Sequence, residues 1–488
     1  MVRFIRYSLV KVPAAGNYND GSLNNVGSNG NAWSSTPNGG NNAYNLNFND
    51  GNKDVNNNNR KNGYSVRPVL GLSTRLTHYM LHVLLVTCSN FHLLTIMYSL
   101  SKTKLLFDLY YAFQCAKRHK SSKEYVKVFE SNLHENLVEL RDELYERRYK
   151  PQPSVCFIIS DPKKREIFAA NFRDRIVHHL YYNYTYDMFN RTFIEDSYSC
   201  RIGKGTHYGI RRLDKHIRQE TRNYKETAYV LKMDIKGYFI HINRPLLLSL
   251  VMSTLNKMKH RRMEQNKPKY CDAIDFDLLE YLSKEIILLN PIENCIVKSS
   301  KEEWETLDKS KSLFYSDTDC GLPIGNLTSQ LFSNVYLNVL DQFMKRELRC
   351  KHYGRYVDDF YVVSNDKNFL LSVASKVDKF LNENLYLELQ HKKTIIVDTK
   401  YGVEFLGGFV MPYRTYLSNK TIKRMNKNLY KFQTQGTDKN VCNMVNSYIG
   451  MFSHYSSNLI KKEVMDKTTK LKDYGYFIGF YDKFVENA

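Results

Sequence analysis

Three acidic residues lie in or directly after runs of strand-forming residues. Asp234 follows the apolar run Thr227–Met233, and the adjacent Asp358 and Asp359 lie inside the run Tyr353–Val363. Magnesium prefers hard oxygen ligands such as carboxylates. Two such ions roughly 3.5–4 Å apart activate a hydroxyl and stabilise a leaving pyrophosphate during in-line attack at phosphorus. The sequence therefore predicts a site for two Mg²⁺ ions at these three aspartates, with Mn²⁺ as the alternative ion.

Geometry and charge both bear on this prediction. Neighbouring residues of a straight strand point to opposite faces, so Asp358 and Asp359 can reach one site only across a tight strand–turn–strand. Two carboxylates about 4 Å apart repel by several kcal/mol at intermediate dielectric, so a cluster requires cations. The alternative is an ordinary hairpin turn, a common place for aspartate. A third segment, Gly321–Gln330, lies between these acidic motifs, and the order of all three on a basic chain favours catalysis.

The surrounding segments predict the elements that hold these residues. The runs Thr227–Met233 and Tyr353–Val363 are rich in aromatic and β-branched residues and predict strands. Apolar residues recur at mostly helical spacing in Ser122–Arg148, and Leu331–Leu340 also indicates a helix. Ser418–Gln435 predicts a basic helix that Ser418 could cap. Mixed helices and strands of this kind predict an α+β fold.

The charge of the chain points to a polyanionic partner. Lys and Arg number 71 against 50 Asp and Glu, which gives a formal net charge of +21. A surplus of this size favours nucleic acid over a membrane, with an unspecific basic surface as the alternative. Nine cysteines without a CxxC pair indicate reduced thiols and a cytoplasmic location rather than a zinc site. The apolar stretch His78–Leu100 contains polar residues that argue against a membrane span.

The segment from about 104 to 410 resembles a reverse transcriptase. Asp234 matches the family's first catalytic aspartate, and Asp358 and Asp359 match its YxDD box. The resemblance implies a right-hand polymerase fold, with fingers, a palm of antiparallel sheet and helices, and a helical thumb at 411–488. It also implies template RNA, deoxynucleoside triphosphates and a cDNA product.

Other residues match the family's substrate-binding positions. Phe239 lies where the family's steric gate excludes a ribose 2′-hydroxyl. Arg165, in Lys163–Arg165, resembles the first fingers motif, and Arg201 resembles the arginine that contacts the triphosphate. Lys393 lies where a lysine protonates the leaving pyrophosphate. The segment Glu404–Gly408 resembles the primer grip.

The segment Gly321–Gln330 narrows the resemblance. Its residues Ile324, Gly325 and Gln330 are expected to bind substrate, and many relatives carry Gln where this chain has Ile324. The form seen here resembles reverse transcriptases of diversity-generating retroelements, and also some bacterial antiviral ones. Ile324 replaces an amide's hydrogen bonds with an apolar contact, so geometry is checked less strictly. The resemblance implies error-prone copying, chiefly at template adenines.

Residues 1–70 favour the first of these two. Of the 46 residues in Asn17–Asn62, eighteen are Asn. Residues 11–70 resemble the end of a C-type-lectin-like domain, the fold that diversity-generating elements vary. Trp33–Ser35 and Gly63–Leu70 carry the match, and Asn lies at many positions that vary in such domains. Changing the adenines of Asn codons never creates a stop codon, so residues 1–70 are interpreted as a translated template repeat and 71–103 as an apolar spacer. The alternative is plain Asn-rich disorder, and disorder is expected in either case.

The sequence therefore favours the error-prone polymerase of a diversity-generating retroelement. The alternatives are a bacterial antiviral reverse transcriptase and, outside the enzymes, a nucleic-acid-binding scaffold with an inactive polymerase fold. The family works with a small basic accessory protein that forms an oligomer, which the resemblance implies as a partner. No membrane association is expected.

Overall fold

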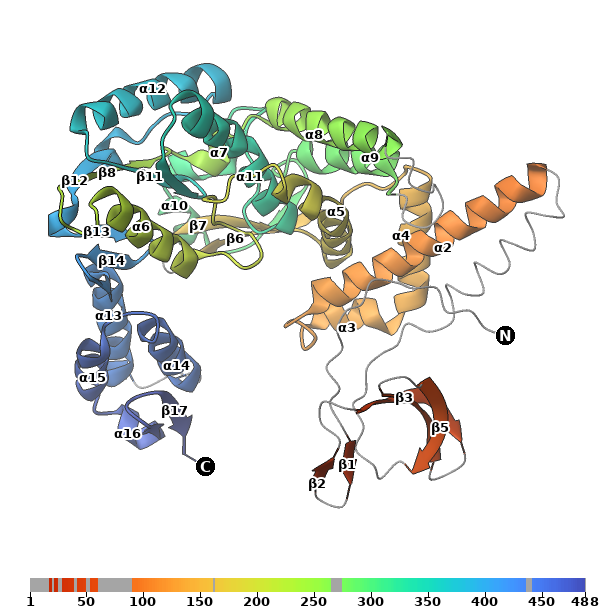
Figure 1. Ribbon diagram of the computed structural model, residues 1–488. Coiled ribbons are helices and arrows are strands. Elements are labelled where there is room, and N and C mark those ends of the chain that lie inside the picture. The colour runs from red at the N-terminus through yellow and green to blue at the C-terminus, as the bar shows by residue number, and fades with distance from the viewer. Residues whose placement is uncertain are drawn as a thin grey trace. The chain divides into compact units, whose positions relative to one another are not determined.

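The computed structural model describes residues 101–487 except 161–162, 265–273 and 436–440, and leaves out the side chains of 262–264 (Figure 1). Upstream of residue 101 it describes only the backbone of five strands and the start of helix α2 (Asn90–Lys117). The chain divides into two compact units, residues 1–100 and 101–488. The candidate site lies in the second unit.

The first unit contains two small antiparallel sheets. Strand β1 (Asn17–Asn19) pairs with β2 (Ser22–Asn24). The second sheet has the order β3 (Asn29–Asn38), β4 (Asn42–Asn49) and β5 (Lys53–Asn59). The disorder expected for residues 1–70 and the spacer 71–103 fall largely outside the described residues, as does most of His78–Leu100. None of the helices that the structure describes has the length and apolar character of a membrane span.

Four antiparallel strands form the central sheet of the second unit, in the order β10–β11–β8–β12. They are β8 (Tyr229–Asp234), β10 (His352–Tyr356), β11 (Asp359–Ser364) and β12 (Ile395–Asp398). Both strand predictions are confirmed, because β8 covers the first apolar run from Tyr229 onward, and β10 and β11 cover the second except for the turn at 357–358. The register places Asp359 opposite Asp234, so the acidic residues meet at one end of the sheet.

Both faces of this sheet are covered (Figure 1). Phe360 and Val362 belong to the main apolar core, to which helices α5 (Phe172–Asn190), α11 (Leu327–Gln342) and α12 (Lys367–Leu385) also contribute. Tyr361 and Val363 point to the opposite face and pack with residues of α6 (Thr206–Glu220), β13 (Val403–Phe405) and β14 (Gly408–Met411). Alternating strand residues reach two different cores, which explains why β11 is apolar almost throughout. The sheet is therefore fixed from both sides.

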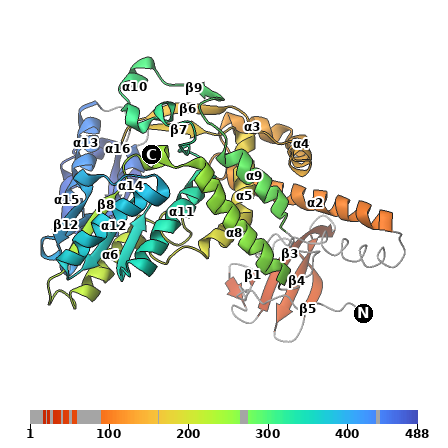
Figure 2. The same ribbon diagram turned by 90° about the horizontal axis from the view of Figure 1, so that it is seen from above.

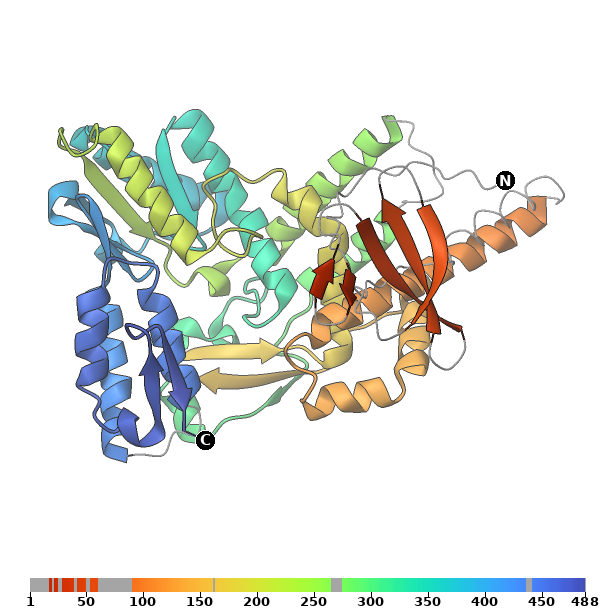
Figure 3. The same ribbon diagram turned by 60° about the horizontal axis from the view of Figure 1, so that its bottom comes forward.

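Other elements surround the sheet. Upstream lie α2 (Asn90–Lys117), α3 (Glu124–Ser131), α4 (Leu133–Tyr145), β6 (Ser154–Ile159), β7 (Arg165–Ala169), α5 (Phe172–Asn190) and α6 (Thr206–Glu220). Next come α7 (Tyr238–His241), α8 (Arg244–Glu264), α9 (Phe276–Ile287), β9 (Cys295–Val297), α10 (Lys301–Glu305), α11 (Leu327–Gln342) and α12 (Lys367–Leu385). Helices α8 and α9 run side by side (Figure 2). Strands β6 and β7 form an antiparallel hairpin (Figure 3), and β9 joins β6 in parallel.

The helix predictions hold with one modification. Ser122–Arg148 forms two helices, α3 and α4, which are interrupted at Asn132. The predicted helix at Leu331–Leu340 is confirmed as part of α11. The basic helix is confirmed as α13 (Asn419–Gln435), and the Ser418 hydroxyl accepts a hydrogen bond from the Thr421 amide at 3.3 Å.

The C-terminal body has its own apolar core. It contains α13, α14 (Val441–Phe452), α15 (Asn458–Asp466), α16 (Leu471–Tyr474), β16 (Gly475–Ile478) and β17 (Lys483–Glu486). The sheet of β13 (Val403–Phe405), β14 (Gly408–Met411) and β15 (Arg414–Leu417) precedes it and runs through the predicted boundary at residue 410. The helical character expected of this region is confirmed, whereas the β16–β17 hairpin was not foreseen.

Candidate active site

The three aspartates meet where β8 ends and the β10–β11 hairpin turns. Tyr356 pairs with Asp359 across the hairpin, so only Val357 and Asp358 form the turn. Asp359 lies directly opposite Asp234 on β8. The carbonyl of Asp358 accepts a hydrogen bond from the Ile235 amide at 3.3 Å. The tight strand–turn–strand expected from the sequence is therefore present.

The turn is strained at Val357. This residue has a φ of 56°, in the left-handed region that β-branched residues rarely adopt. Residues held in such conformations cost of order 1–3 kcal/mol and persist only where their surroundings impose them. The strain lies immediately before Asp358, at the candidate catalytic position.

Burial and mutual repulsion make ionisation of the paired aspartates unfavourable. Burial is the main cause that raises the pKa of Asp358 to about 6, and the nearby Asp234 carboxylate adds to the rise. Burial likewise raises the pKa of Asp359 to about 6, against the positive charge of Lys232. A nearby cation would stabilise these buried carboxylates, because an opposite charge favours their ionised form.

Two basic side chains, Lys393 and Arg165, provide part of this positive charge. The Lys393 ammonium lies 2.7 Å from Asp234 Oδ1, and the positive charge of Arg165 lowers the pKa of Asp358. No three Asp, Glu, His or Cys side chains converge into a ready metal-binding group within the described residues. The carboxylate oxygens of Asp234, Asp358 and Asp359 are nevertheless the hard donors that a divalent ion prefers, and Asp234 already binds the positive charge of Lys393.

The short helix η4 (His391–Lys393) brings Lys393 to the site. The backbone amide of Gln390 donates to the Asp234 carbonyl at 2.8 Å, which joins this segment to the end of β8. Lys236, two residues after Asp234, pairs with Glu388 at 2.9 Å, two residues before Gln390. The predicted closeness of Lys393 to the aspartates is therefore present.

The loop before α11 lies against strand β7. The Phe168 amide donates to the Ile324 carbonyl at 2.9 Å, and the Ala170 amide donates to Asn326 Oδ1 at 3.3 Å. Gly325 has a φ of 131°, and a Cβ there would lie 2.7 Å from the Phe168 carbonyl oxygen. Only glycine fits this approach. Gln330 is exposed on α11.

The same loop is bonded to the segment that carries Phe239. The Leu322 amide donates to the Phe239 carbonyl at 2.8 Å, and the Gly321 amide donates to the Ile242 carbonyl at 2.9 Å. Phe239 is partly buried, with its ring centroid 5.2 Å from that of Tyr238. The structure thus joins the backbones of two segments that the sequence singled out separately.

Arg201 is engaged elsewhere. Its Nη1 donates to the carbonyls of Ile194 and Ser197 at 2.6 and 2.9 Å, and its Nε donates to Asn190 Oδ1 at 2.7 Å. The guanidinium therefore joins the end of α5 to the segment after it. Contact with a triphosphate remains a prediction for this residue.

Sequence reasoning missed one buried ion pair beneath the site. Arg355, on β10, pairs with Asp341 on α11, and both side chains are fully buried. A charged residue inside the apolar run around YVDD was the available signal, because buried charges are normally paired. The partner could not be inferred, because any acidic residue that the fold brings close would satisfy this requirement.

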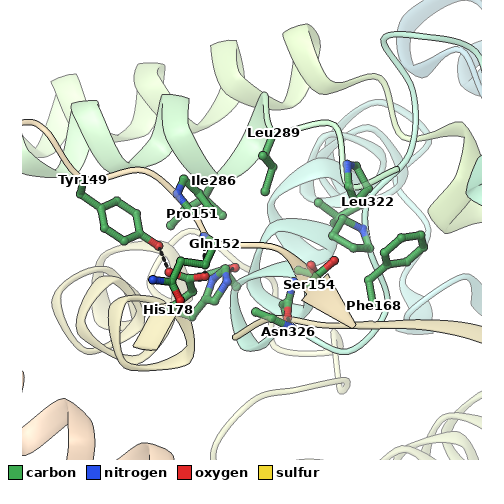
Figure 4. Close-up of a pocket in the computed structure, with 16 residues that line it drawn as sticks. Tyr149, Pro151, Gln152, Ser154, Phe168, His178, Ile286, Leu289, Leu322 and Asn326 are labelled. Atoms are coloured by element: carbon green, nitrogen blue, oxygen red, sulfur yellow. Dashed lines mark hydrogen bonds between the residues drawn. The ribbon is translucent and has the colours of Figure 1, made fainter. Parts of the chain in front are cut away.

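The loop 321–326, called the Ile324 loop below, lines one side of a small cavity with Leu322, Pro323 and Asn326 (Figure 4). Its lining includes Asp174, His178, Leu322 and Thr328. The His178 Nδ1 is 2.7 Å from the Thr328 hydroxyl, and burial lowers the pKa of His178 to about 3. A neutral imidazole is therefore part of the packing that supports the loop.

We expect the free energy of unfolding to fall less between pH 7 and pH 5 in His178→Asn than in the wild type. Folded His178 stays neutral down to about pH 3, whereas the unfolded imidazole takes up a proton below its ordinary pKa of about 6.5. This group therefore costs nothing above pH 6.5 and destabilises the fold increasingly as the pH falls. Between pH 7 and pH 5 its contribution is about 2 kcal/mol. Asn can keep the bond to Thr328 but does not titrate.

Urea unfolding at pH 7 and pH 5 measures this difference. The control is His260→Asn, since His260 is exposed. An equal pH dependence in wild type and His178→Asn would show that His178 is protonated in the folded protein.

A protein-family model described as reverse transcriptase (RNA-dependent DNA polymerase) matches residues 160–409, slightly more than half of the 488 residues. The chain belongs to the reverse transcriptase family. This reverse transcriptase is 25% identical over 307 residues to Protein YkfC of Escherichia coli (strain K12), which covers 55% of this chain and 69% of that protein. Residues 160–409, which the family model matches, contain all three aspartates, the Ile324 loop and Lys393.

Solved structures of telomerases resemble this reverse transcriptase at low identity. Apo telomerase of Candida tropicalis, truncated from its C-terminal domain, is 13% identical with a TM-score of 0.39, and the match covers 55% of each chain. Telomerase of Candida albicans with a fragment of telomeric RNA is 14% identical with a TM-score of 0.37, and covers 68% of this chain and 58% of that one. The reverse transcriptase thus spans little more than half the length of these telomerase chains.

Proposed function

We propose that this chain copies template RNA into DNA with deliberate infidelity, as the reverse transcriptase of a diversity-generating retroelement. The polymerase part of the proposal rests on one observation, the register that sets Asp359 opposite Asp234 with Asp358 in the adjoining turn. DNA synthesis on a defined RNA with deoxynucleoside triphosphates tests it. The diversity-generating part rests on Ile324 and on the Asn-rich residues 1–70.

The proposed chemistry assigns a task to each side chain. Asp234, Asp358 and Asp359 hold two divalent ions, Mg²⁺ or Mn²⁺, which supply Lewis-acid stabilisation of the charge that develops at phosphorus. Lys393, which binds Asp234 here, donates a proton to the leaving pyrophosphate. Arg165 adds positive charge on the fingers side, in agreement with its effect on Asp358.

In this proposal the segment that carries Phe239 and the Ile324 loop select the substrate. The Phe239 ring excludes a ribose 2′-hydroxyl, and Ile324, with Gly325 and Gln330, borders the incoming nucleotide. The hydrogen bond from the Leu322 amide to the Phe239 carbonyl supports a shared role, because it fixes one segment relative to the other. Arg201 contributes to triphosphate binding either directly or by holding the segment 194–201.

The domain assignment is also part of the proposal. Residues 104–410 form the fingers and palm, and 411–488 form the thumb, whose helices begin at α13. Residues 1–70 represent a translated template repeat, followed by an apolar spacer at 71–103. The proposed setting is the cytoplasm, with a small basic accessory protein as partner.

We expect Ile324→Gln to raise fidelity at template adenines by several-fold. A glutamine amide adds a hydrogen bond that orders the incoming nucleotide, worth roughly 0.5–1.5 kcal/mol net. Each 1.4 kcal/mol of discrimination is about tenfold. Because the Ile324 carbonyl and Gly325 are held against Phe168, the substitution changes a side chain on a fixed backbone. Sequencing the DNA copied from a defined RNA measures the error at each template base.

Ile324→Leu is the matched control, because it keeps an apolar contact. Equal wild-type error at all four template bases would remove the diversity-generating assignment and leave the polymerase. That result would favour the antiviral alternative, whereas a folded protein without synthesis would favour the inactive scaffold. DNA flanking the gene gives a second test, since a near-copy of the codons for residues 11–70 that differs at adenines is expected there.

A further inference from the structure

Arg355 has hydrogen-bond partners in every direction although it is completely buried. Its Nε and Nη2 donate to the two carboxylate oxygens of Asp341 at 2.8 and 2.6 Å. Nη2 also donates to the Ser197 hydroxyl at 3.3 Å, and Nη1 to Asn334 Oδ1 at 3.4 Å. The remaining bond runs from Nη1 to the Val357 carbonyl at 2.9 Å. Five N–H donors therefore meet five acceptors, the full capacity of a guanidinium.

The bond to Val357 reaches the catalytic turn directly. Val357 is the residue with the strained φ of 56°, and the next residue is Asp358. A strained turn persists only where its surroundings over-determine it. Arg355 can hold the Val357 carbonyl in place, because its own position is fixed by its ion pair with the fully buried Asp341 on α11.

The same arginine binds the segment that carries Arg201. The Arg355 amide donates to the Asp196 carbonyl at 2.8 Å, and the Tyr198 amide donates to the Arg355 carbonyl at 2.9 Å. The Ser197 carbonyl, between these two residues, accepts from Arg201 Nη1 at 2.9 Å. One residue thus joins the aspartate turn to the arginine expected to act on the triphosphate.

We propose that Arg355 is a positioning residue, which holds the Val357–Asp358 turn in its strained form so that Asp358 and Asp359 face the metal ions together. This proposal rests on the assignment of the aspartates as metal ligands. Asp341 is the counter-ion that orients Arg355. The Arg355–Asp341 pair is then required to place Asp358 and Asp359 for the reaction. An experiment has to separate this effect from the contribution of the pair to folding stability.

Apolar replacement allows that separation. Exchanging a buried ion pair for well-packed apolar residues of similar volume is often neutral for stability, whereas removing one partner is not. Tyr353 must be included, because its hydroxyl donates to Asp341 Oδ1 at 2.7 Å. The test variant is therefore the triple replacement Asp341→Leu, Tyr353→Phe and Arg355→Met. The second variant, Arg355→Lys, keeps the charge but cannot span both Asp341 and the Val357 carbonyl.

Four quantities are measured in the full chain: thermal stability, Mn²⁺ binding by electron paramagnetic resonance, hydrogen exchange over residues 353–362 and kcat on primer–template. In the triple variant we expect the protein to remain folded with a lower melting temperature, because the Ser197 hydroxyl, Asn334 Oδ1 and the Val357 carbonyl lose a donor. Metal affinity and kcat should each fall by about 10- to 100-fold, the range typical of groups that orient metal ligands. Exchange in the hairpin should quicken. Arg355→Lys should move the same quantities in the same direction by a smaller amount.

The control removes a partly buried ion pair elsewhere, with Glu143→Leu and Arg173→Met, and should leave kcat and Mn²⁺ binding unchanged. Retention of kcat and Mn²⁺ affinity within twofold in a folded variant at Arg355 would overturn the proposal. Failure of the metal assignment itself has a different signature, because Asp358→Asn would then remain active while Arg355 was untouched.

Discussion

Asp358→Asn and Asp359→Asn are each expected to reduce DNA synthesis by about a thousandfold or more. Each change keeps the size of the side chain and removes the negative charge that a bound cation requires. Metal ions supply several kcal/mol of transition-state charge stabilisation, and about 4 kcal/mol corresponds to a thousandfold in rate. Burial raises the pKa of both aspartates, so keeping them ionised is unfavourable when no cation is bound.

Binding of primer–template should change by no more than a few-fold in these variants. Most of that affinity comes from basic side chains that contact phosphates, and the chain carries a net charge of +21. Single-nucleotide extension measures the rate, and fluorescence anisotropy measures the binding. Asp366→Asn is the matched control, since Asp366 is an exposed N-cap of α12 and Asn caps a helix equally well. Substantial synthesis by the double variant at 358 and 359 would refute the assignment.

The sequence predicted the positions of the aspartates because local patterns determine them. Strand-forming residues flank Asp358 and Asp359, and two adjacent carboxylates can share a site only at a tight turn. The register that sets Asp359 opposite Asp234 is a finding of the structure, and it agrees with the common site expected for the three aspartates. The same reasoning located α11 and α13, where apolar periodicity and a capping serine mark a helix.

Contacts between distant segments could not be predicted in this way. Arg355 was visible as a charge in an apolar strand, but its partner Asp341 depends on how α11 packs beneath the sheet. The partners of Arg201 are backbone carbonyls, which carry no sequence signal. Backbone bonds also join the Ile324 loop to Phe168 and to Phe239. Tertiary packing, which no local pattern encodes, determines all of these contacts.

Gly354→Ala is expected to destabilise the fold by about 3 kcal/mol, although it adds a single methyl group. Gly354 lies in β10, two residues before Tyr356. A Cβ at this position would collide with the Tyr198 hydroxyl and lie 2.7 Å from Cζ and Oη of Tyr361. Both rings are fully buried. Extra atoms forced into a close-packed core typically cost 1–3 kcal/mol, and more where the neighbours cannot move.

The neighbours of Gly354 are fixed by hydrogen bonds. The hydroxyls of Tyr198 and Tyr361 are 2.9 Å apart, Tyr198 donates to Asp196 Oδ1 at 3.1 Å, and Tyr361 Oη is 3.0 Å from His216 Nδ1. Displacing either ring would break bonds that have no access to water, and unpaired buried polar groups cost about 1–3 kcal/mol each. The strand therefore requires glycine at position 354 because two tyrosine hydroxyls occupy the space of its side chain.

Urea unfolding of two further variants separates this steric effect from the general effect of replacing glycine. Gly450 lies in helix α14, where an added Cβ meets nothing within 4 Å, so Gly450→Ala should stabilise the protein by up to about 1 kcal/mol. Combining Gly354→Ala with Tyr198→Phe removes the nearest colliding atom. The double variant should then be less destabilised than the sum of the two single variants, which is the mark of residues in contact. Simple additivity would mean that the hydroxyl of Tyr198 is not what excludes a side chain at position 354.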